Sequence, residues 1–580
     1  MSLPVAKNWN FLPAPDPATV ANLGAAVPVG AEVAALLVQR GIATAGAAAA
    51  FFNPDLAALP DPLLMQDMGR AVARLAQALR GGEKVLVLGD YDVDGITSVA
   101  VVMSYLTPLF GAARLRDYIP DRYTEGYGIS TKAIDTAAAE GYALIVALDC
   151  GIKANEAVAY ANTQGVDFII CDHHLPGDTL PAAVAVLDPK RADCQYPYKE
   201  LSGCGVGFKL MQALGRHLGR DEAELFDLLD LLTVSIAADV VPITGENRVL
   251  AAHGLRRFNE DAARLRPGLA ALRELATLRE GRLTISSLIF GFAPRINAAG
   301  RMGDARRAVA MLLAPNQVEA RHTAEVVDQM NLQRRGSDQL TTQQALARIA
   351  ADPALQNARA TVLYQADWHQ GVLGIVASRC LDLYYRPTVI LTQRNGRATG
   401  SARSVAGFDI HSALETCAPL LDQYGGHRAA AGLTLKVENV PEFQRRFEEV
   451  VAETLHSEHL VRPVDIAATL PLARLTEGFF EELAPLEPFG PGNPAPVFAT
   501  HGLRAAPGSA RLVGTNHLKL RLLAADGRPG PVLDAIGFGL ASYLPLVEQG
   551  QPFSACYTVE MNEYRGFRNV QLRLVDLRWG

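Results

Sequence analysis

The chain has 580 residues, of which 49% are hydrophobic and 20% are charged. This composition is typical of globular proteins and excludes a disordered or low-complexity chain. The length exceeds what one hydrophobic core usually organises, so we expect three or four domains. The formal net charge of −7 excludes a globally basic nucleic-acid-binding protein, so any positive charge for such a partner must be local.

The cysteine pattern and the N-terminus indicate where the protein resides. Seven scattered cysteines without a CxxC pair exclude a zinc ribbon and a thioredoxin motif, and they indicate reduced thiols. The first eleven residues, MSLPVAKNWNF, lack the apolar core of a signal peptide, and the Ala-rich stretch at 47–52 is too short to span a bilayer. We therefore expect a soluble, cytoplasmic protein without a membrane segment.

Apolar periodicity divides the chain into five regions. Helical spacing dominates the first region, short apolar runs alternate with helices in the two α/β domains, and every second residue is apolar in predicted strands of the last region. Pro315 and Gly336 are expected to interrupt the connector, and PFGPGNPAP (488–496) marks the entry to the last fold. The regions are a helical N-terminal region packing on the first domain (1–80), a first α/β domain (81–303), connector helices (304–350), a second, smaller α/β domain (351–457) and a β-rich domain (458–580).

Predicted strands lie in both α/β domains and in the last domain. Continuous apolar runs of this length are typical of buried parallel strands, and alternation is typical of half-buried ones. The runs of the first domain are VLVLG (85–89), LIVAL (144–148), DFIIC (167–171) and VAVL (184–187); the other strands are predicted near 361–365, 388–393, 517–523 and 570–577.

An aspartate directly follows each of the four apolar runs of the first domain: Asp90, Asp149, Asp172 and Asp188. Ligands of open α/β sheets bind beyond the carboxyl ends of the strands, so these side chains predict a site at that edge. A single aspartate there is more simply a loop or helix-capping residue, but the set of four favours a functional site.

Four motifs combine carboxylates with imidazoles: DYDVDG (90–95), LDCG (148–151), DHH (172–174) and AADVVP (237–242). Mixed oxygen and nitrogen ligands suit a borderline divalent ion, with Mn²⁺ preferred and Mg²⁺ as the alternative. DYDVDG is no EF-hand, because Val101 occupies the loop position where a glutamate is required. Two divalent ions that share a carboxylate activate water and stabilise the charge of phosphoryl transfer, so the motifs predict a metal-dependent phosphoesterase.

In this order and spacing the motifs resemble the DHH phosphoesterase superfamily, and most closely its bacterial single-strand-specific exonucleases. The resemblance covers nearly the whole chain and implies an α/β protein. A parallel-sheet DHH domain would be joined by a long helix to a smaller α/β DHHA1 domain, followed by a β-barrel OB-like domain. Further segments that carry it are IPDRYTEGYG (119–128), INAAGRMGDA (296–305), WHQGVLGIVASR (368–379), GSARS (400–404), GGHRAAAG (425–432) and PFGPGNP (488–494).

The resemblance implies a ligand set for two divalent ions. Asp149 would bridge the ions, while Asp92 and Asp94 would each hold one of them. Asp90 is either a further ligand or a hydrogen-bond partner of the ligands. The full set is Asp90, Asp92, Asp94, Asp149, His173 and Asp239.

The resemblance also implies catalytic and substrate-binding residues around the ions. Asp172 and His174 would orient the ligands or the scissile phosphate, and a direct catalytic role of His174 stays open beside a supporting one. Arg301 would reach the scissile phosphate. Arg122 and Tyr123 lie in a loop that is suited to contact DNA, although tyrosines in loops are as often packing residues.

The second α/β domain offers a predicted 5′-phosphate site. Ser401 and Arg403 in GSARS would bind the phosphate together with the turn formed by Gly425, Gly426 and His427, whose backbone N–H groups suit an anion. An isolated GGH would be only a tight turn, but GSARS in the same domain favours phosphate binding. Candidates in the OB-like domain are Arg511, His517, Lys519, Arg521, Tyr564, Arg565, Phe567 and Arg568, although alternating cations on a strand are more often a solvated face.

The resemblance implies a 5′→3′ exonuclease on single-stranded DNA that releases 5′-mononucleotides in DNA repair and recombination. It would act as a monomer alongside a single-strand-binding protein and a RecQ-type helicase. A phosphatase on small substrates is the alternative enzyme, but such a substrate leaves the OB-like domain without a use. A non-catalytic DNA-binding scaffold is the alternative class, and loss of the ligand residues would mark it, whereas this chain retains them.

Overall fold

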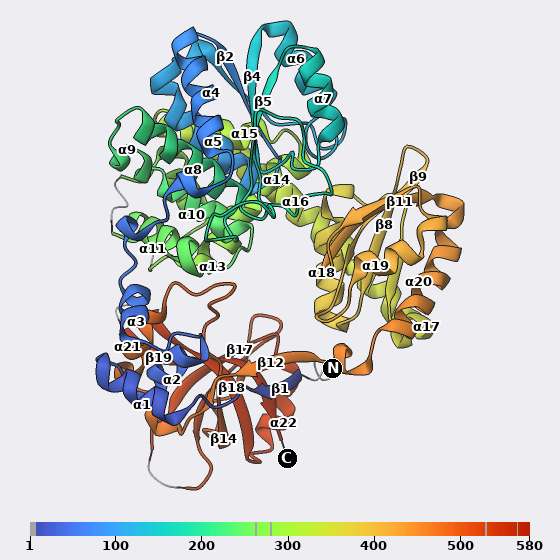
Figure 1. Cartoon of the computed structure of the whole chain (residues 1–580). Helices are drawn as coiled ribbons and strands as arrows, with labels where there is room; N and C mark the ends of the chain where they lie inside the picture. The colour runs from blue at the N-terminus through green and yellow to red at the C-terminus, as the bar shows by residue number, and fades with distance from the viewer. Residues whose placement is uncertain (1–6, 261–263, 279–280, 528–529, 565–566, 580) are drawn as a thin grey trace. The chain divides into compact units, whose positions relative to one another are not determined.

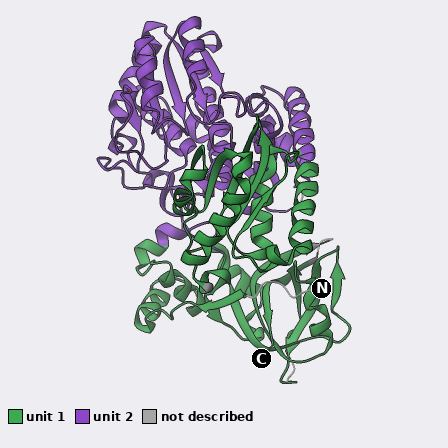
Figure 2. Cartoon of the chain, turned by 90° about the vertical axis from the view of Figure 1, so that its right-hand side faces the viewer, with its two compact units in different colours: residues 1–48, 334–485, 495–580 green, residues 49–333, 486–494 purple. Residues whose placement is uncertain are grey.

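The computed structural model describes residues 7–260, 264–278, 281–527, 530–564 and 567–579 (Figure 1). The chain divides into two compact units (Figure 2). Unit 1 comprises residues 1–48, 334–485 and 495–580, and unit 2 comprises residues 49–333 and 486–494. The N-terminal residues and the C-terminal domain therefore belong to the same unit.

A five-stranded parallel sheet forms the centre of unit 2, in the order β3-β2-β4-β5-β6. Its strands are β2 (Lys84–Gly89), β3 (Leu115–Tyr118), β4 (Tyr142–Leu148), β5 (Asp167–Cys171) and β6 (Ala185–Leu187). Four of them coincide with the predicted apolar runs, which confirms that prediction. β3 has no such run, because it is an edge strand and two of its four residues, Arg116 and Asp117, are charged.

Helices cover both faces of this sheet, which is why its strands are continuously apolar. Val85 and Val87 pack with α4, α5, α8 and α10 on one face, while Leu86 and Leu88 pack with α6 and α7 on the other (Figure 1). The α-helices that lie wholly in unit 2 are α4 (Met68–Gly81), α5 (Val93–Phe110), α6 (Thr131–Glu140), α7 (Asn155–Thr163), α8 (Gly203–His217), α9 (Glu222–Phe226), α10 (Leu229–Ala238), α11 (Gly245–Asn259), α12 (Pro267–Leu275), α13 (Ile285–Ser287), α14 (Ala293–Met302) and α15 (Arg306–Leu312).

The connector helix α16 runs from Gln317 to Ala351 without a break. The expected interruption at Gly336 is therefore wrong. A glycine inside a helix costs about 1 kcal/mol relative to alanine, which a helix of 35 residues tolerates. The boundary between the two units falls inside α16.

The second α/β domain, in unit 1, has a five-stranded mixed sheet in the order β10-β11-β9-β8-β7. Only β7 and β8 pair in parallel, and they confirm the two strands predicted there. The strands are β7 (Thr361–Tyr364), β8 (Thr388–Arg394), β9 (Arg397–Arg403), β10 (Gln423–Gly426) and β11 (Ala430–Lys436), and the helices are α17 (Pro353–Asn357), α18 (Leu373–Tyr384), α19 (Ile410–Thr416) and α20 (Val440–Thr454).

The C-terminal domain is a seven-stranded sheet in the order β13-β14-β18-β19-β17-β16-β15. β14 also pairs with β16, so β14, β18, β19, β17 and β16 form a closed ring of five paired strands, which fits an OB-type fold. β16 and β19 confirm the two predicted alternating strands. The strands are β13 (Ala468–Thr469), β14 (Phe498–Ala505), β15 (Arg511–Val513), β16 (His517–Ala524), β17 (Leu533–Phe538), β18 (Phe553–Tyr564) and β19 (Phe567–Arg578), with α21 (Glu477–Leu483) and α22 (Leu544–Glu548).

The N-terminal region differs from its prediction in structure and in packing. Strand β1 (Lys7–Phe11) pairs in parallel with β12 (Arg462–Ile466), and the buried indole of Trp9 donates to Asp576 at 2.8 Å. Helices α1 (Pro17–Ala26) and α2 (Ala31–Gln39) lie in unit 1 as well. The expectation that all of 1–80 packs on the first α/β domain is therefore wrong for residues 7–48.

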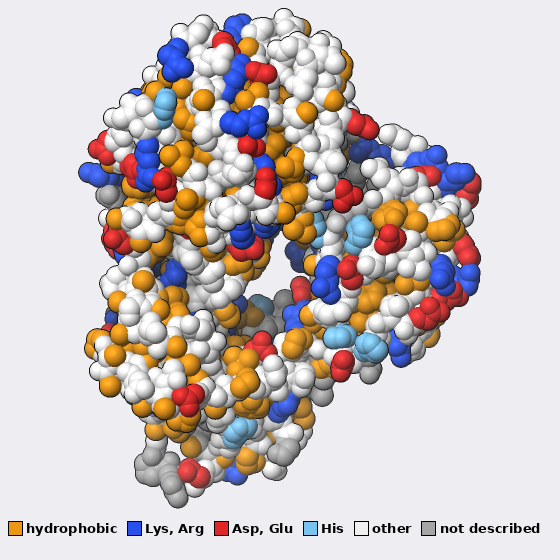
Figure 3. Space-filling view, in the orientation of Figure 1, with side chains coloured by type: hydrophobic (Ala, Val, Ile, Leu, Met, Phe, Trp, Pro, Cys, Tyr) orange, Lys and Arg blue, Asp and Glu red, His pale blue; other side chains and the backbone are white. Residues whose placement is uncertain are grey.

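The cysteines and the charged side chains fit the composition. All seven cysteines are free and buried. Basic and acidic side chains are interspersed on the face shown in Figure 3, in keeping with the small net charge. Helix α5 has the length and apolarity of a membrane span, but 78% of the helix is buried within the protein, as in the core helix of a globular domain.

Candidate metal centre

Four aspartates gather at the carboxyl edge of the parallel sheet in unit 2. Asp90, Asp149, Asp172 and Asp188 follow β2, β4, β5 and β6, and all four are buried. Adjacent parallel strands end at one edge, so these carboxylates come from neighbouring positions. The four carboxylates therefore lie together at the predicted edge of the sheet.

Helix ends bring three further carboxylates to this edge. Asp92 caps α5, where its side chain accepts a hydrogen bond from Gly95 N at 3.2 Å, and Asp94 lies in the first turn of the same helix. Asp239 caps the C-terminal end of α10. The positive end of the α5 dipole favours the two carboxylates at its start.

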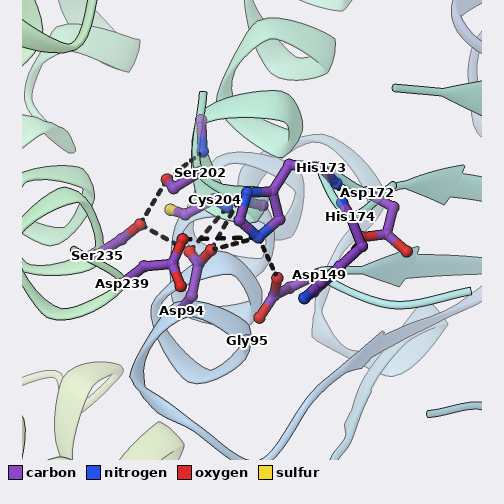
Figure 4. A network of polar contacts seen from close by, with 12 residues as sticks. Asp94, Gly95, Asp149, Asp172, His173, His174, Ser202, Cys204, Ser235 and Asp239 are labelled. Carbon is purple, nitrogen blue, oxygen red and sulfur yellow. Dashed lines mark hydrogen bonds and ion pairs between the residues drawn. The ribbon is translucent and has the colours of Figure 1, made fainter. Parts of the chain in front are cut away.

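His173 stands among carboxylates from three different elements (Figure 4). Its Nε2 lies 3.3 Å from Asp149 Oδ1, 3.5 Å from Asp239 Oδ2 and 3.9 Å from Asp94 Oδ2. Neither ring nitrogen has a hydrogen-bond partner within the described residues, although the ring is buried. A buried imidazole without a partner is expected to have another ligand in the working protein.

Three groups of side chains could each hold a metal ion, because the ligand atoms within each group lie within 4.8 Å of one another. The groups are Asp90–Asp92–Asp149, Asp94–His173–Asp239 and Asp149–His173–His174. Asp149 belongs to two of them, which is compatible with its predicted bridging role. Asp172 belongs to none of them.

Burial changes the ionisation of this cluster. Burial, followed by the charges of neighbouring aspartates, raises the pKa of Asp149 and Asp90 well above the usual range. The same causes raise the pKa of Asp239 to about 9, and burial lowers the pKa of His173. A dense set of carboxylates with a neutral imidazole is the donor set that divalent cations take, so the residues fit a metal centre.

Asp172 holds His174 in place. Its Oδ1 accepts from His173 N at 2.8 Å and lies 2.7 Å from His174 Nδ1, while its Oδ2 accepts from Ile152 N at 2.9 Å. These bonds occupy the carboxylate of Asp172 and hold the His174 ring by its Nδ1. These contacts are compatible with the predicted orienting role of Asp172.

The start of α8 contributes groups that the sequence motifs do not reveal. The small residues of the segment SGCGVGFK (202–209) are typical of a turn, but α8 is already helical from Gly203. Gly203 N and Cys204 N donate to Asp94, and Ser235 Oγ from α10 donates to it as well. A Cβ at Gly203 would lie 2.6 Å from Asp149 Oδ1. The run of small residues is the signal for this close approach.

The loop that precedes α6 contacts α14, the helix that carries Arg301. The hydroxyl of Tyr123 donates to the carbonyl of Arg301, and the guanidinium of Arg122 lies 4.7 Å from the centre of the Tyr91 ring. Tyr127 is exposed, and its ring meets that of His174 edge-on at 6.3 Å between centroids. The structure thus brings Tyr123 and Arg301 together and adds Tyr127 beside the centre.

The predicted phosphate-binding residues lie together in one sheet of unit 1. Ser401 and Arg403 are on β9, and Arg403 Nη1 donates to Ser401 Oγ at 2.8 Å. Gly425 and Gly426 are on β10, with β11 between the two strands. His427 follows in the exposed turn after β10.

The C-terminal candidates divide by their position in the fold. Arg511 pairs with Lys519 across β15 and β16, and His517, Lys519 and Arg521 alternate with buried leucines on β16. Arg568 is exposed at the start of β19. Arg565 and the side chains of Tyr564 and Phe567 lie outside the described residues.

Three family models match the chain, each within one predicted domain. They are the DHH family N-terminal domain at residues 84–236, the DHHA1 domain at 357–453 and the RecJ OB domain at 466–576. The chain is similar to the single-stranded-DNA-specific exonucleases RecJ of Dickeya dadantii and Escherichia coli, at 37% identity to each. The alignments cover 90% of this chain and 92% of the Dickeya protein, and 88% of this chain and 90% of the Escherichia protein.

A solved structure agrees with this sequence similarity. The crystal structure of RecJ from Thermus thermophilus in complex with Mn²⁺ superposes with a TM-score of 0.82 at 32% identity, covering 99% of this chain and 80% of that chain. The Mg²⁺ complex of the same protein gives 0.76 at 31% identity, covering 99% and 78%. The order of domains, the identity and the coverage lead to one assignment. The chain belongs to the RecJ family of single-stranded-DNA-specific exonucleases.

Proposed function

We propose that this chain degrades single-stranded DNA from the 5′ end, with two divalent cations at the carboxyl edge of the parallel sheet. It is a metal-dependent phosphodiesterase, and relatives are named for this substrate. Mn²⁺ is the preferred ion because the ligands combine carboxylate oxygens with an imidazole nitrogen, and Mg²⁺ is the alternative; structures of a family member contain each of them. The ligands we assign are Asp90, Asp92, Asp94, Asp149, His173 and Asp239.

The observation that carries this proposal is the buried, unpartnered imidazole of His173 among three carboxylates. An isolated buried imidazole would be stabilised by a hydrogen bond, and none is present among the described residues. Mutual repulsion of Asp94, Asp149 and Asp239 in a buried site is relieved most directly by cations. When bound, divalent ions supply Lewis acidity, which makes water a better nucleophile and neutralises phosphoryl oxygens.

His174 is the group we assign to the scissile phosphate. Burial lowers the pKa of His174, but its hydrogen bond to Asp172 and that carboxylate's charge raise it by more, so the pKa is raised overall. A cationic ring with Nδ1 held by Asp172 presents Nε2–H to a phosphoryl oxygen. Arg301, Arg122 and Tyr123 are further proposed contacts of the DNA near the centre.

Recognition of the strand end is assigned to Ser401, Arg403 and the turn of Gly425, Gly426 and His427. Hydrolysis of the first internucleotide bond breaks the P–O3′ bond and releases a 5′-mononucleotide. The phosphate stays on the shortened strand, so every cut creates a new 5′-phosphorylated end. A site for a 5′-phosphate would therefore bind the product of each cut as the next substrate.

We also propose the cellular setting of this activity. The chain would act as a monomer in the cytoplasm, in DNA repair and recombination. A single-strand-binding protein and a RecQ-type helicase would supply single strands, because the exonuclease itself requires unpaired DNA.

The test is digestion of a long single strand that carries a labelled 5′-phosphate, in the presence of Mn²⁺. Labelled mononucleotide is expected first, and Asp149→Ala should abolish its release while the protein stays folded. A 3′-labelled strand distinguishes polarity, since its label should appear only late. Equal digestion of blunt duplex, or activity confined to dinucleotides, would overturn the proposal.

A further inference from the structure

The carboxylate of Asp94 is held on both oxygens by the protein itself (Figure 4). Gly203 N donates to Oδ2 at 2.7 Å, while Cys204 N at 2.9 Å and Ser235 Oγ at 2.6 Å donate to Oδ1. The two amides are the first N–H groups of α8, so the carboxylate sits at the positive end of that helix. A side chain with 1% exposure is thus fixed in one orientation.

Proton counting sets the direction of the hydroxyl chain behind Asp94. Ser235 gives its only hydroxyl proton to the carboxylate, so Ser202, whose Oγ lies 2.7 Å from Ser235 Oγ, must donate to Ser235. Ser202 in turn accepts from Gly205 N at 3.1 Å, as the capping residue of α8. The bonds therefore run in one direction, from the start of α8 through two hydroxyl groups to Asp94.

Ser235 also contacts a second candidate ligand through its backbone. The N–H of Asp239 donates to the carbonyl of Ser235 at 2.9 Å, at the end of α10. One residue thus bonds the side chain of Asp94 and the backbone of Asp239. Both of these aspartates face Nε2 of His173.

We infer that Ser235 is a positioning residue for the ion held by Asp94, His173 and Asp239, with Ser202 as its support. The inference rests on the proposed metal centre and assigns a specific role within it. Hydrogen bonds to ligating carboxylates orient them, and their loss typically weakens metal binding by about 10–100-fold. The other group, Asp90–Asp92–Asp149, receives no hydrogen bond from Ser235 within the described residues, so only one ion site should depend on it.

The test is Mn²⁺ binding to the full chain with Ser235→Ala, measured by calorimetry and by electron paramagnetic resonance. We expect one of two Kd values to rise about tenfold, while the other changes less than twofold. Ser202→Ala should act in the same direction, and the double variant should add little to Ser235→Ala because both hydroxyls act through one chain. Alanine suits the helix at position 235, so circular dichroism should show an intact fold.

Ser98→Ala is the matched control. Ser98 is also buried, and its Oγ donates at 2.7 Å to the backbone carbonyl of Asp94 and not to the carboxylate. Both Kd values should stay unchanged in this variant. Unchanged Mn²⁺ binding in Ser235→Ala would overturn the inference, as would equal weakening of both ions together with a lower melting temperature. Tight Mn²⁺ binding without hydrolysis of single strands would instead refute the proposed function and leave the role of Ser235 standing.

Discussion

Gly203 is the position at which a single methyl group should disturb the metal centre most directly. A Cβ atom there would lie 2.6 Å from both Cβ and Oδ1 of Asp149 and 2.8 Å from its Cα. Real Cβ atoms do not approach other atoms so closely, so Gly203→Ala must move either Asp149 or the start of α8. Asp149 is held firmly, because its N–H donates to Cys171 O at 2.8 Å and its φ is +60°, in the left-handed region.

Either movement reaches the predicted ligands. A shift of Asp149 displaces the carboxylate that two ligand groups share, and a shift of α8 withdraws Gly203 N from Asp94. Overpacking of this kind destabilises a fold by about 1–3 kcal/mol. In a unit of this size each kcal/mol lowers Tm by about 2 °C. A reacting group displaced by about 1 Å is expected to lower kcat/KM about 100-fold.

The assay compares Gly203→Ala with Gly207→Ala, one turn further along α8. A Cβ at Gly207 would meet only the side-chain tips of Leu148 at 3.2 Å and Val102 at 3.5 Å, which can shift. Mononucleotide release from a single strand in Mn²⁺, and the melting temperature, are measured for both variants. Gly207→Ala should keep wild-type activity. Equal activity of the two variants would refute the reasoning that the packing of Gly203 fixes Asp149.

Three further predictions concern ionisation, strand-end recognition and the C-terminal domain. In the presence of a chelator at pH 8, the Asp239→Asn variant should have a higher melting temperature than the wild type. Burial raises the pKa of Asp239 to about 9, whereas the pKa of an aspartate in the unfolded chain is near 4. The Asp239 carboxyl therefore destabilises the metal-free fold increasingly as the pH rises above about 4. The variant should also lose stabilisation by Mn²⁺, and a thermal-shift series from pH 5 to 9 without either change would contradict the argument. Arg403→Ala should raise KM for a 5′-phosphorylated strand about tenfold relative to a 5′-hydroxyl strand, by loss of a charge-assisted bond. Arg379→Ala is the control, because it removes the guanidinium that lies 2.7 Å from the buried carboxylate of Asp338. It should lower Tm and leave the ratio of the two KM values unchanged. An equal change of this ratio in both variants would show that Arg403 does not bind the 5′-phosphate. Trp9→Phe takes one of two side-chain donors from buried Asp576 and should destabilise the C-terminal domain by about 1–3 kcal/mol, so an unchanged urea midpoint would count against it.

The strand-ending aspartates are predictable because two simple rules coincide there. A strand buried on both faces is continuously apolar, and the first charged residue after it marks its end. Asp90 and Asp149 follow this pattern. β3 does not show this pattern, because an edge strand tolerates the charged residues Arg116 and Asp117. The start of α8 is not predictable in this way, because a run of small residues is typical of a turn as well as of a helix that approaches another element closely.

The placement of the N-terminus has no local signal. Lys7 pairs with Arg462, and Trp9 bonds to Asp576, across most of the length of the chain. The local sequences of these two short strands indicate only that each is extended, and they do not indicate which strand pairs with which. The partner is selected by what else is buried beside it, which here includes the charged acceptor for the indole N–H.

The hydrogen bonds around Asp94 bear on how DNA can bind to this edge. Backbone N–H groups at a helix start are a common site for phosphate, but those of Gly203 and Cys204 at α8 are already used by a carboxylate of the chain. Without metal ions this edge therefore offers carboxyl groups, which do not attract a negatively charged DNA backbone. Bound cations would add positive charge there, next to His174, whose pKa is lowered by burial but raised overall by its hydrogen bond to Asp172. Binding of the scissile phosphate should consequently depend on the same ions that promote its hydrolysis, whereas recognition of the 5′ end by Arg403 should not.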